Sequence, residues 1–223
     1  MAASAESRTK VLVVEDHAAL GEALQFAFSF EDDIEVVGLA GTVAAALEMT
    51  VAERPDVILM DVNLPDGNGI DATRKVLEVQ PATAVVVLTA HADPVFALRA
   101  AEAGAAGFVA KDVRMAKIVG AVRSVRSGQV AVDPTVLRSL RAQAAGDGAP
   151  AKRPNGSLDP GQLAVLELLA RGAGAEKIAD QLGLDAAQAT AAVAALRADL
   201  GARSPLEALV LAVRRGLMVP AAG

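Results

Sequence analysis

The chain of 223 residues has no cysteine, tryptophan or tyrosine, and five phenylalanines bring its aromatic content to only 2%. Without cysteine it can form neither disulfide bonds nor metal sites with thiolate ligands. The absence of thiols fits a reducing compartment, where disulfides are rare.

Long apolar runs are also missing. Residues 11–14 form a run far too short for the hydrophobic region of a signal peptide. No segment approaches the roughly 20 apolar residues of a membrane-spanning helix. We therefore expect a soluble cytoplasmic protein without a membrane partner. The chain has no excess of positive charge either, because its formal net charge is −6, so its composition indicates no general attraction to nucleic acid.

Short apolar runs alternate with segments of helical apolar spacing over the first 128 residues. The predicted strands cover residues 11–14, 34–39, 57–61, 84–88 and 108–110. The predicted helices cover residues 18–30, 43–52, 70–79, 94–103 and 112–127, the last capped by Asp112. Five such units predict an α/β domain with a parallel sheet and helices on both faces.

A carboxylate ends the strand Val57-Ile58-Leu59-Met60-Asp61, whose first four residues are large and apolar. In an open parallel sheet, the carboxyl ends of the strands share the edge where ligands bind. Other charged or hydroxyl side chains follow strands at the same edge, namely Glu15, Asp16, Thr89 and Lys111. We expect these five side chains to meet in one site.

The chemistry of this group favours phosphoryl transfer. Carboxylates of Glu15, Asp16 and Asp61, with the backbone carbonyl of Asn63, suit a Mg²⁺ ion. A carboxylate can act as the nucleophile, which gives Asp61 the role of phosphoacceptor. Thr89 and Lys111 can then contact the phosphoryl oxygens.

Two other interpretations apply to the same residues. Each acid could cap the helix that follows its strand, although five converging polar groups disfavour that explanation. A metal-dependent hydrolase would need a further base or acid directed at water, and His91 is the candidate nearby; the other histidine, His17, follows the acid pair.

Residues 9–128 resemble the receiver domain of two-component response regulators. The resemblance is carried by Glu15-Asp16, Thr89, Lys111 and the loop Asp61-Val62-Asn63-Leu64-Pro65-Asp66-Gly67-Asn68-Gly69. It implies a flavodoxin-like fold with strand order 2-1-3-4-5. It also implies that a histidine kinase phosphorylates Asp61, with Mg²⁺ held by Glu15, Asp16, Asp61 and the carbonyl of Asn63.

The same resemblance assigns roles around the site. Thr89 and the aromatic residue Phe108 would couple phosphorylation to the fourth helix and the sheet edge, although Phe108 could also be a plain core residue. Asn63 and His91 occupy positions that tune the loss of phosphate. A receiver catalyses only its own phosphotransfer and dephosphorylation, so no other enzymatic activity is expected.

The periodicity weakens after the first domain. Residues 129–157 are predicted to form a linker, with a possible helix from Pro134 to Arg141. Four short helices are predicted within residues 158–218, in a helix-turn-helix arrangement with a turn at Gly183. Their start signals are Asp159-Pro160, Asp185 with Gln188, and Ser204-Pro205 with Glu207.

This second domain resembles the four-helix output domain of NarL/FixJ (LuxR-type) regulators. The matching positions include Leu158-Asp159-Pro160, Lys177-Ile178-Ala179, Leu182-Gly183-Leu184 and Leu200-Gly201. The resemblance implies that residues 185–200 form a recognition helix for the DNA major groove. On it, Gln188, Ala189, Thr190 and Ala192 replace the usual Thr-Val-Lys and following His, and Asp199 replaces a usual Lys. The remaining candidates for DNA contact are Lys177, Gln188, Thr190 and Arg197.

The charge of the second domain leaves two hypotheses open. From residue 158 onward there are six cations and seven acids, whereas DNA affinity depends largely on Lys and Arg. The chain could be a phosphorylation-switched transcription regulator that binds DNA weakly or cooperatively as a homodimer. Alternatively, its second domain no longer binds DNA and is a protein-interaction module.

Overall fold

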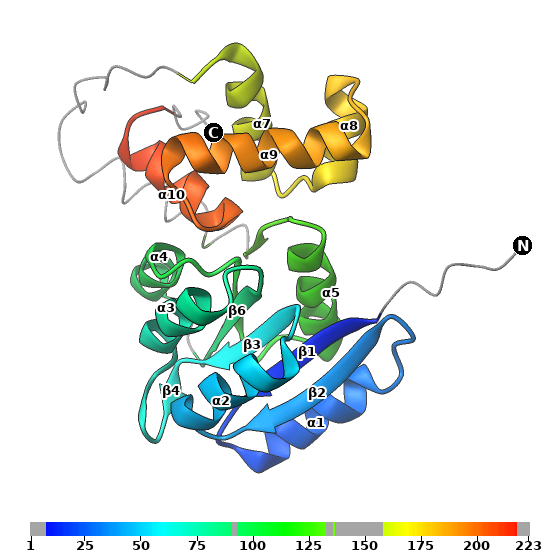
Figure 1. Ribbon diagram of the computed structural model, residues 1–223, viewed down its shortest axis with the longest axis vertical. Helices are drawn as coiled ribbons and strands as arrows, with labels where there is room; N and C mark the ends of the chain where they lie inside the picture. The colour runs from blue at the N-terminus through cyan, green and yellow to red at the C-terminus, as the bar shows by residue number, and fades with distance from the viewer. Residues whose placement is uncertain (1–7, 91–92, 133–135, 137–157, 218–223) are drawn as a thin grey trace, which may run out of the picture.

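The computed structural model describes residues 8–90, 93–132, 136 and 158–217, and it contains an α/β domain followed by a helical domain (Figure 1). Most of the predicted linker lies outside the described residues, as does most of the possible helix at 134–141. The domain boundaries at 9–128 and 158–218 therefore stay predictions. In the described part of the chain, every helix is too short or too polar to cross a membrane.

The N-terminal domain contains one parallel sheet. Its strands lie in the order β2 (Ile34–Ala40), β1 (Thr9–Val14), β3 (Val57–Asp61), β6 (Ala84–Thr89), β7 (Gly107–Ala110) and β8 (Ala131–Val132). The first five confirm the predicted order 2-1-3-4-5. The sixth, β8, is an addition in the segment that we expected to be linker.

Strand β8 can pair with β7 because Gly107 has no side chain. A Cβ atom at this position would lie 2.9 Å from the Ala131 Cβ and 3.0 Å from its carbonyl oxygen. Either distance is too short for an ordinary contact, so a larger residue at position 107 would push β8 away from the sheet.

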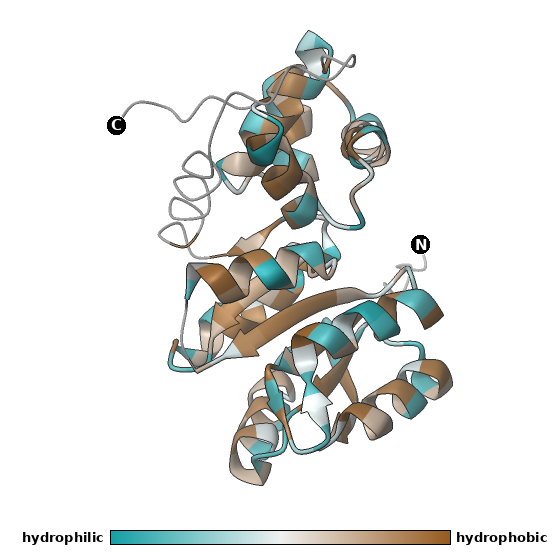
Figure 2. Cartoon of the chain, turned by 90° about the vertical axis from the view of Figure 1, so that its left-hand side faces the viewer, coloured by the Kyte–Doolittle hydropathy of each residue, from teal (hydrophilic) through white to brown (hydrophobic). Residues whose placement is uncertain are grey.

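Helices cover both faces of the sheet, as alternating strand residues require. Helices α1 (Ala18–Phe28) and α5 (Met115–Arg126) pack on one face, against residues such as Val11, Val13 and Leu59. Helices α2 (Val43–Glu53), α3 (Gly69–Val79) and α4 (Pro94–Glu102) cover the other face, with Leu12, Val14 and Met60 beneath. Figure 2 shows the apolar strands enclosed between these helices.

One predicted helix start is wrong. Helix α5 begins at Met115 and not after Asp112, and its N-cap residue Arg114 makes no side-chain capping bond. The segment after β7 leaves the sheet through a turn before the helix begins, so the acidic residue stands too early to reach the free amides of the first helical turn.

The C-terminal domain consists of α7 (Pro160–Ala170), α8 (Ala175–Leu182), α9 (Ala186–Leu200) and α10 (Pro205–Arg214). The predicted caps form: Asp159 with Gln162 and Asp185 with Gln188 are capping boxes, and Ser204 accepts from the Glu207 amide. Gly183 ends α8 in the left-handed conformation, with φ 66°, which turns the chain into α9.

The two domains meet where α10 packs on α4. Leu206 and Val210 of α10 are buried against Ala101 of α4. The Ser204 hydroxyl donates to the Ala105 carbonyl at 2.7 Å, and the Arg203 guanidinium donates to the Glu102 carbonyl at 2.7 Å. Arg214 forms an ion pair with the Glu102 side chain. The contact thus combines an apolar centre with polar bonds around it.

Candidate functional site: an acidic pocket at the sheet edge and an exposed third helix

The first candidate site lies at the carboxyl edge of the sheet. Asp61 is the last residue of β3, and Glu15 directly follows β1; Asp61 is only 1% exposed and Glu15 only 7%. Two buried carboxylates this close repel each other and lose hydration. They require a neighbouring cation.

Lys111 provides one such cation from the end of β7. Its Nζ lies 2.7 Å from Glu15 Oε2 and 2.8 Å from Asp61 Oδ2. Burial acts to lower the pKa of Lys111, but the two carboxylates outweigh it, so the pKa is raised above its usual value. Lys111 is therefore a fixed positive charge at neutral pH, as predicted for a group that faces a phosphoryl oxygen.

His17 lies on the other side of the acid pair. Its Nδ1 is 3.0 Å from Glu15 Oε1 and 2.8 Å from Asp16 Oδ1. The hydrogen bond to Glu15 and the charge of Asp16 raise the pKa of His17. His17 had no predicted role from the sequence, although its position directly after Glu15-Asp16 indicates that it lies beside these acids.

The donors in this pocket fit a hard divalent cation. Ligand atoms of Glu15, Asp16, His17 and Asp61 all lie within 4.8 Å of one another. Glu15 Oε2 and Asp61 Oδ2 are buried, and Lys111 is their only polar partner among the described residues. Carboxylate oxygens with spare lone pairs are what Mg²⁺ prefers. The acidic pocket of Glu15, Asp16 and Asp61 is thus typical of a Mg²⁺ site.

The loop after Asp61 is shaped by a short hairpin, β4 (Asn63–Leu64) with β5 (Gly67–Asn68). Asn63 is exposed, and the Asn68 side chain caps α3 by accepting from the Ile70 amide at 2.9 Å. A Cβ at Gly69 would lie 1.8 Å from the Asp61 carbonyl oxygen. Only glycine permits this approach, so the residue at position 69 allows the chain to pass close to the Asp61 backbone.

Asp66 has a role that the sequence did not reveal. Its carboxylate accepts from the amides of Val43 at 2.7 Å and Ala44 at 3.0 Å, at the start of α2. These two backbone bonds lower the pKa of Asp66. Because Asp66 caps a helix more than 20 positions earlier in the chain, no local pattern could identify it.

Two other predicted residues of this site, Thr89 and Phe108, are buried in strands of the sheet. Thr89 ends β6 at 5% exposure. Phe108 in β7 is 1% exposed and packs with Val87, Ile70 and alanines of α4. Phe108 thus connects the sheet to α4 through direct packing. His91 lies outside the described residues.

The second candidate site is α9, whose predicted contact residues make internal bonds. The Gln188 side-chain oxygen accepts from the Asp185 amide at 2.9 Å, and the Thr190 hydroxyl donates to the Ala186 carbonyl at 2.9 Å. Lys177 on α8 is exposed. The side of α9 that carries Thr190 and Arg197 lines a groove of about 210 Å³ shared with the N-terminal domain.

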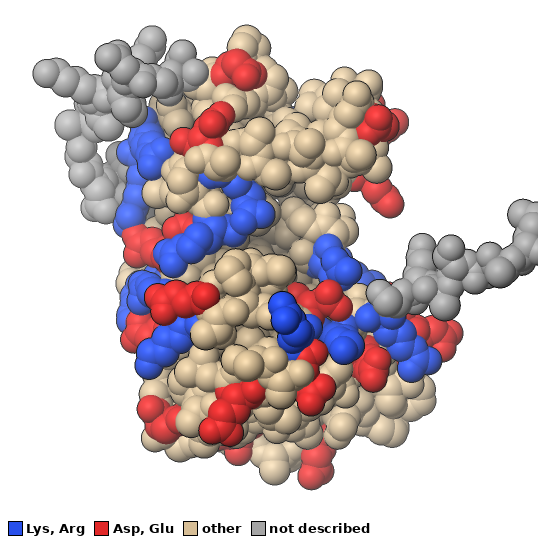
Figure 3. All heavy atoms as spheres, viewed as in Figure 1, with Lys and Arg blue, Asp and Glu red and all other residues tan. Residues whose placement is uncertain are grey.

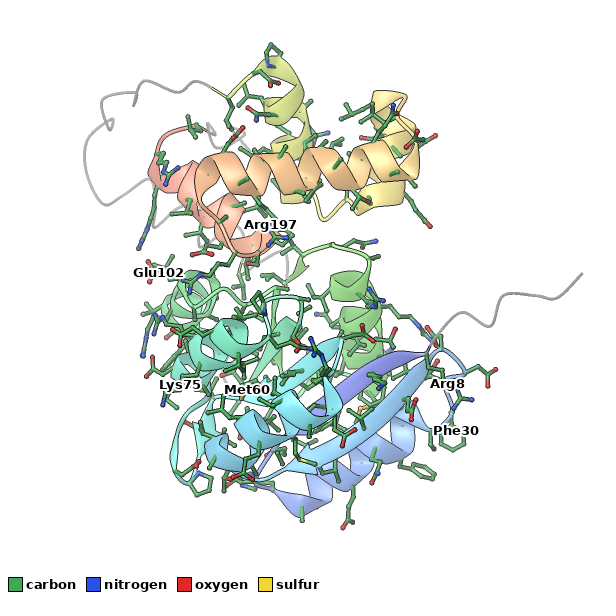
Figure 4. All side chains as sticks on the ribbon, viewed as in Figure 1. Arg8, Phe30, Met60, Lys75, Glu102 and Arg197 are labelled. Atoms are coloured by element: carbon green, nitrogen blue, oxygen red, sulfur yellow. The ribbon has the colours of Figure 1, made fainter. Side chains whose placement is uncertain are left out.

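Arg197, the only cation of α9, points toward the N-terminal domain (Figure 4). Its guanidinium donates to the Arg203 carbonyl, and its buried Nε has no hydrogen-bond partner in the part of the chain that the structure describes. Burial lowers the pKa of Arg197, and the charge of Glu207 only partly offsets this. Figure 3 shows the visible face of α9 as largely uncharged.

Comparison with known proteins agrees with both domains. The sequence family described as "Response regulator receiver domain" matches residues 11–123. The chain is 34% identical over 203 residues to the DNA-binding transcriptional activator DevR/DosR of Mycobacterium tuberculosis, covering 91% of this chain and 93% of the relative.

Two solved structures are similar to parts or most of the chain. A LuxR-family response regulator from Aurantimonas sp. SI85-9A1 has 29% identity and a TM-score of 0.58, covering 61% of this chain and 98% of that structure. A structure of the Salmonella typhimurium RcsB response regulator, at 20% identity, shares the fold over 91% of this chain and 97% of that one, with a TM-score of 0.57.

The profile match spans half of the chain, and the mycobacterial relative matches nearly all of it. Together with the acidic pocket, the sheet order and the four-helix domain, these matches decide the family. The chain belongs to the two-component response regulators that join a receiver domain to a LuxR-type transcription-regulatory output domain, and it is a transcription factor and not a conventional enzyme.

Proposed function

We propose that a histidine kinase phosphorylates Asp61 in a Mg²⁺-dependent reaction, and that this changes the activity of the output domain. The observation that carries the proposal is the buried Asp61 carboxylate, whose Oδ2 faces the Lys111 ammonium at 2.8 Å and has no further hydrogen-bond partner among the described residues. Such an oxygen is both accessible to a cation and poorly solvated, which suits a nucleophile.

Different residues of this chain have different roles in the phosphoryl transfer. Glu15, Asp16, Asp61 and the Asn63 carbonyl would hold Mg²⁺, which when bound supplies positive charge against the carboxylates and the incoming phosphate. The Lys111 ammonium neutralises one phosphoryl oxygen, and the Thr89 hydroxyl donates to another. Asn63 and His91 tune the lifetime of the phosphate.

The packing suggests how the change reaches the output domain. Phe108 lies against α4, and α4 carries the contact with α10. Movement of Thr89 toward a phosphoryl group would open space near Phe108 and shift α4. The bonds of Ser204, Arg203 and Arg214 to this region then lose their geometry, so the two domains separate more readily.

The experiment that tests phosphorylation is acetyl-phosphate labelling of the wild type and of Asp61→Asn, with intact mass as the readout. The wild type should gain the mass of one phosphoryl group when Mg²⁺ is present, and the variant should gain none. No adduct on the wild type, even with a kinase as the donor, would refute the proposal.

For the output domain we propose weak DNA binding as a homodimer, through a recognition helix that has lost most of its usual contacts. The similarity to a DNA-binding activator supports DNA. The charge of the domain limits its affinity for DNA, because the chain from residue 158 onward contains six cationic and seven acidic residues. The contacts in question are Lys177, Gln188, Thr190 and Arg197.

The second candidate function is a protein-interaction module without DNA binding. The inward position of Arg197 favours it, because that side chain donates to the Arg203 carbonyl and lines the interdomain groove. The exposed alanines of α9 would permit close approach of another helix.

A mobility-shift series at increasing salt, with phosphorylated and unphosphorylated full-length protein, separates the two functions. Binding that weakens with salt supports DNA, whereas no binding at low salt in either state refutes it. The double variant Thr190→Lys/Ala192→His restores the usual charges. If it fails to bind where the wild type fails, surface charge is not the limitation.

A further inference from the structure

His17 is the one residue of the acidic pocket for which the proposed function has no use. Its side chain is 73% exposed, so packing does not hold it. Its backbone is the N-cap position of α1, without a side-chain capping bond. What orients the imidazole is the pair of carboxylates that its Nδ1 faces, Glu15 and Asp16.

The oxygens of Glu15 are divided between two partners. Oε2 faces the Lys111 ammonium at 2.7 Å, and Oε1 faces His17 Nδ1 at 3.0 Å. Glu15 Oε1, Asp16 and His17 therefore lie together around the oxygen of Glu15 that Lys111 does not contact.

The spacing of these atoms matches that of ligands around one ion. An octahedral cation with bonds of about 2.0–2.1 Å places neighbouring ligand atoms about 2.9 Å apart. His17 Nδ1 lies 2.8 Å from Asp16 Oδ1 and 3.0 Å from Glu15 Oε1. With Asp61, the ligand atoms of all four residues fall within 4.8 Å of one another.

We propose that His17 is a ligand of this metal site and makes it prefer divalent transition metals, such as Co²⁺, over Mg²⁺. The proposal rests on the proposed function, since it concerns the same ion. Imidazole nitrogen is a good ligand for first-row transition metals, whereas Mg²⁺ binds mainly oxygen. A nitrogen donor therefore adds affinity for Co²⁺ and little for Mg²⁺.

The test is calorimetric titration of the full-length protein with Mg²⁺ and, separately, with Co²⁺. The variants are His17→Ala and His17→Asn, and the control is Gln25→Ala, at an exposed position of α1 outside the acidic pocket. His17→Ala should lower Co²⁺ affinity about tenfold or more and Mg²⁺ affinity less than about threefold. Gln25→Ala should leave the ratio of the two affinities unchanged.

A second measurement does not depend on how the variants fold. In the wild type, the ¹⁵N signal of His17 Nδ1 should shift more when diamagnetic Zn²⁺ binds than when Mg²⁺ binds.

The variants give a third readout. The visible absorption of bound Co²⁺ should change on His17→Ala as one nitrogen ligand is lost. His17→Asn, which places an amide near the position of Nδ1, should keep Mg²⁺ affinity near the wild-type value without restoring the preference for Co²⁺.

The outcomes separate this proposal from the proposed function. Equal losses for both metals in His17→Ala, the same change of ratio in Gln25→Ala, or an unshifted Nδ1 signal on Zn²⁺ binding would each overturn the role of His17 while the Mg²⁺ site stands. If the wild type binds neither metal, the proposed function itself fails. Retained binding of both metals in Asp61→Asn would place the ion elsewhere and overturn both.

Discussion

Replacing Ser204 with alanine should weaken the docking of the output domain on the receiver. The Ser204 hydroxyl makes two bonds: it accepts from the Glu207 amide at 3.0 Å, which caps α10, and it donates to the buried Ala105 carbonyl at 2.7 Å. Loss of an N-cap costs about 0.5–2 kcal/mol, and a buried carbonyl left without a donor costs about 1–3 kcal/mol. The two effects together predict a loss of roughly 2–4 kcal/mol.

Only the second effect depends on docking. When the domains separate, water can bond to the Ala105 carbonyl, so the cost of the missing donor falls on the docked state alone. Because about 1.4 kcal/mol corresponds to a tenfold change in an equilibrium constant, the ratio of docked to undocked protein should fall by roughly 5- to 150-fold.

The matched control is Thr42→Ala in the receiver. The Thr42 side chain accepts from the Ala45 amide at 3.1 Å and caps α2, without a contact to the output domain. This variant should lose about 1 kcal/mol of stability and leave docking unchanged.

The composition of the chain determines which assays can be used. Urea unfolding must be followed by circular dichroism, because the chain has neither tryptophan nor tyrosine as a fluorescent probe. Since there is no native cysteine, spin labels on Glu22→Cys and Glu167→Cys, both at exposed positions, report the distance between the domains. If Ser204→Ala gives the wild-type distance distribution and the same stability loss as Thr42→Ala, the hydroxyl contributes nothing to docking and the reasoning is wrong.

Three further predictions concern the receiver. Gly69→Ala should slow labelling of Asp61 by acetyl phosphate, because the new Cβ would lie 1.8 Å from the Asp61 carbonyl oxygen; an unchanged labelling rate would contradict this. Asp66→Asn should lower the melting temperature at neutral pH, since the folded-state pKa of Asp66 is depressed by its bonds to α2. The stabilisation by the Asp66 carboxylate is fully present above the ordinary pKa of 3.8 and is lost as pH falls through the lower folded-state pKa. The melting temperatures of the wild type and the variant should therefore converge in acid. A difference in melting temperature that stays constant with pH would argue against the cap. Phe108→Ala should cost about 3–5 kcal/mol in urea unfolding, because the side chain is 1% exposed; a loss under about 1 kcal/mol would mean that Phe108 does not fill the space beside α4.

The sequence by itself determined the parts of this protein that depend on local periodicity and on strand ends. Apolar runs closed by Glu15, Asp61 and Lys111 predicted a parallel sheet and the meeting of these side chains, because parallel strands must bring their carboxyl ends to one edge; the strand order came from the resemblance to receiver domains. The helix starts at Asp159, Asp185 and Ser204 were equally readable, since a capping bond spans only three residues.

Tertiary structure decided what depends on contacts between distant segments. Asp66 caps α2 across 23 positions, and Ser204 bonds to Ala105 across 99; neither pairing has a local pattern. The inward position of Arg197 depends on the loop before α10, where its guanidinium donates to the Arg203 carbonyl; the predicted DNA contact of Arg197 stays a prediction. Local patterns specify which groups a segment can offer, but only the packed fold determines which partner each group meets.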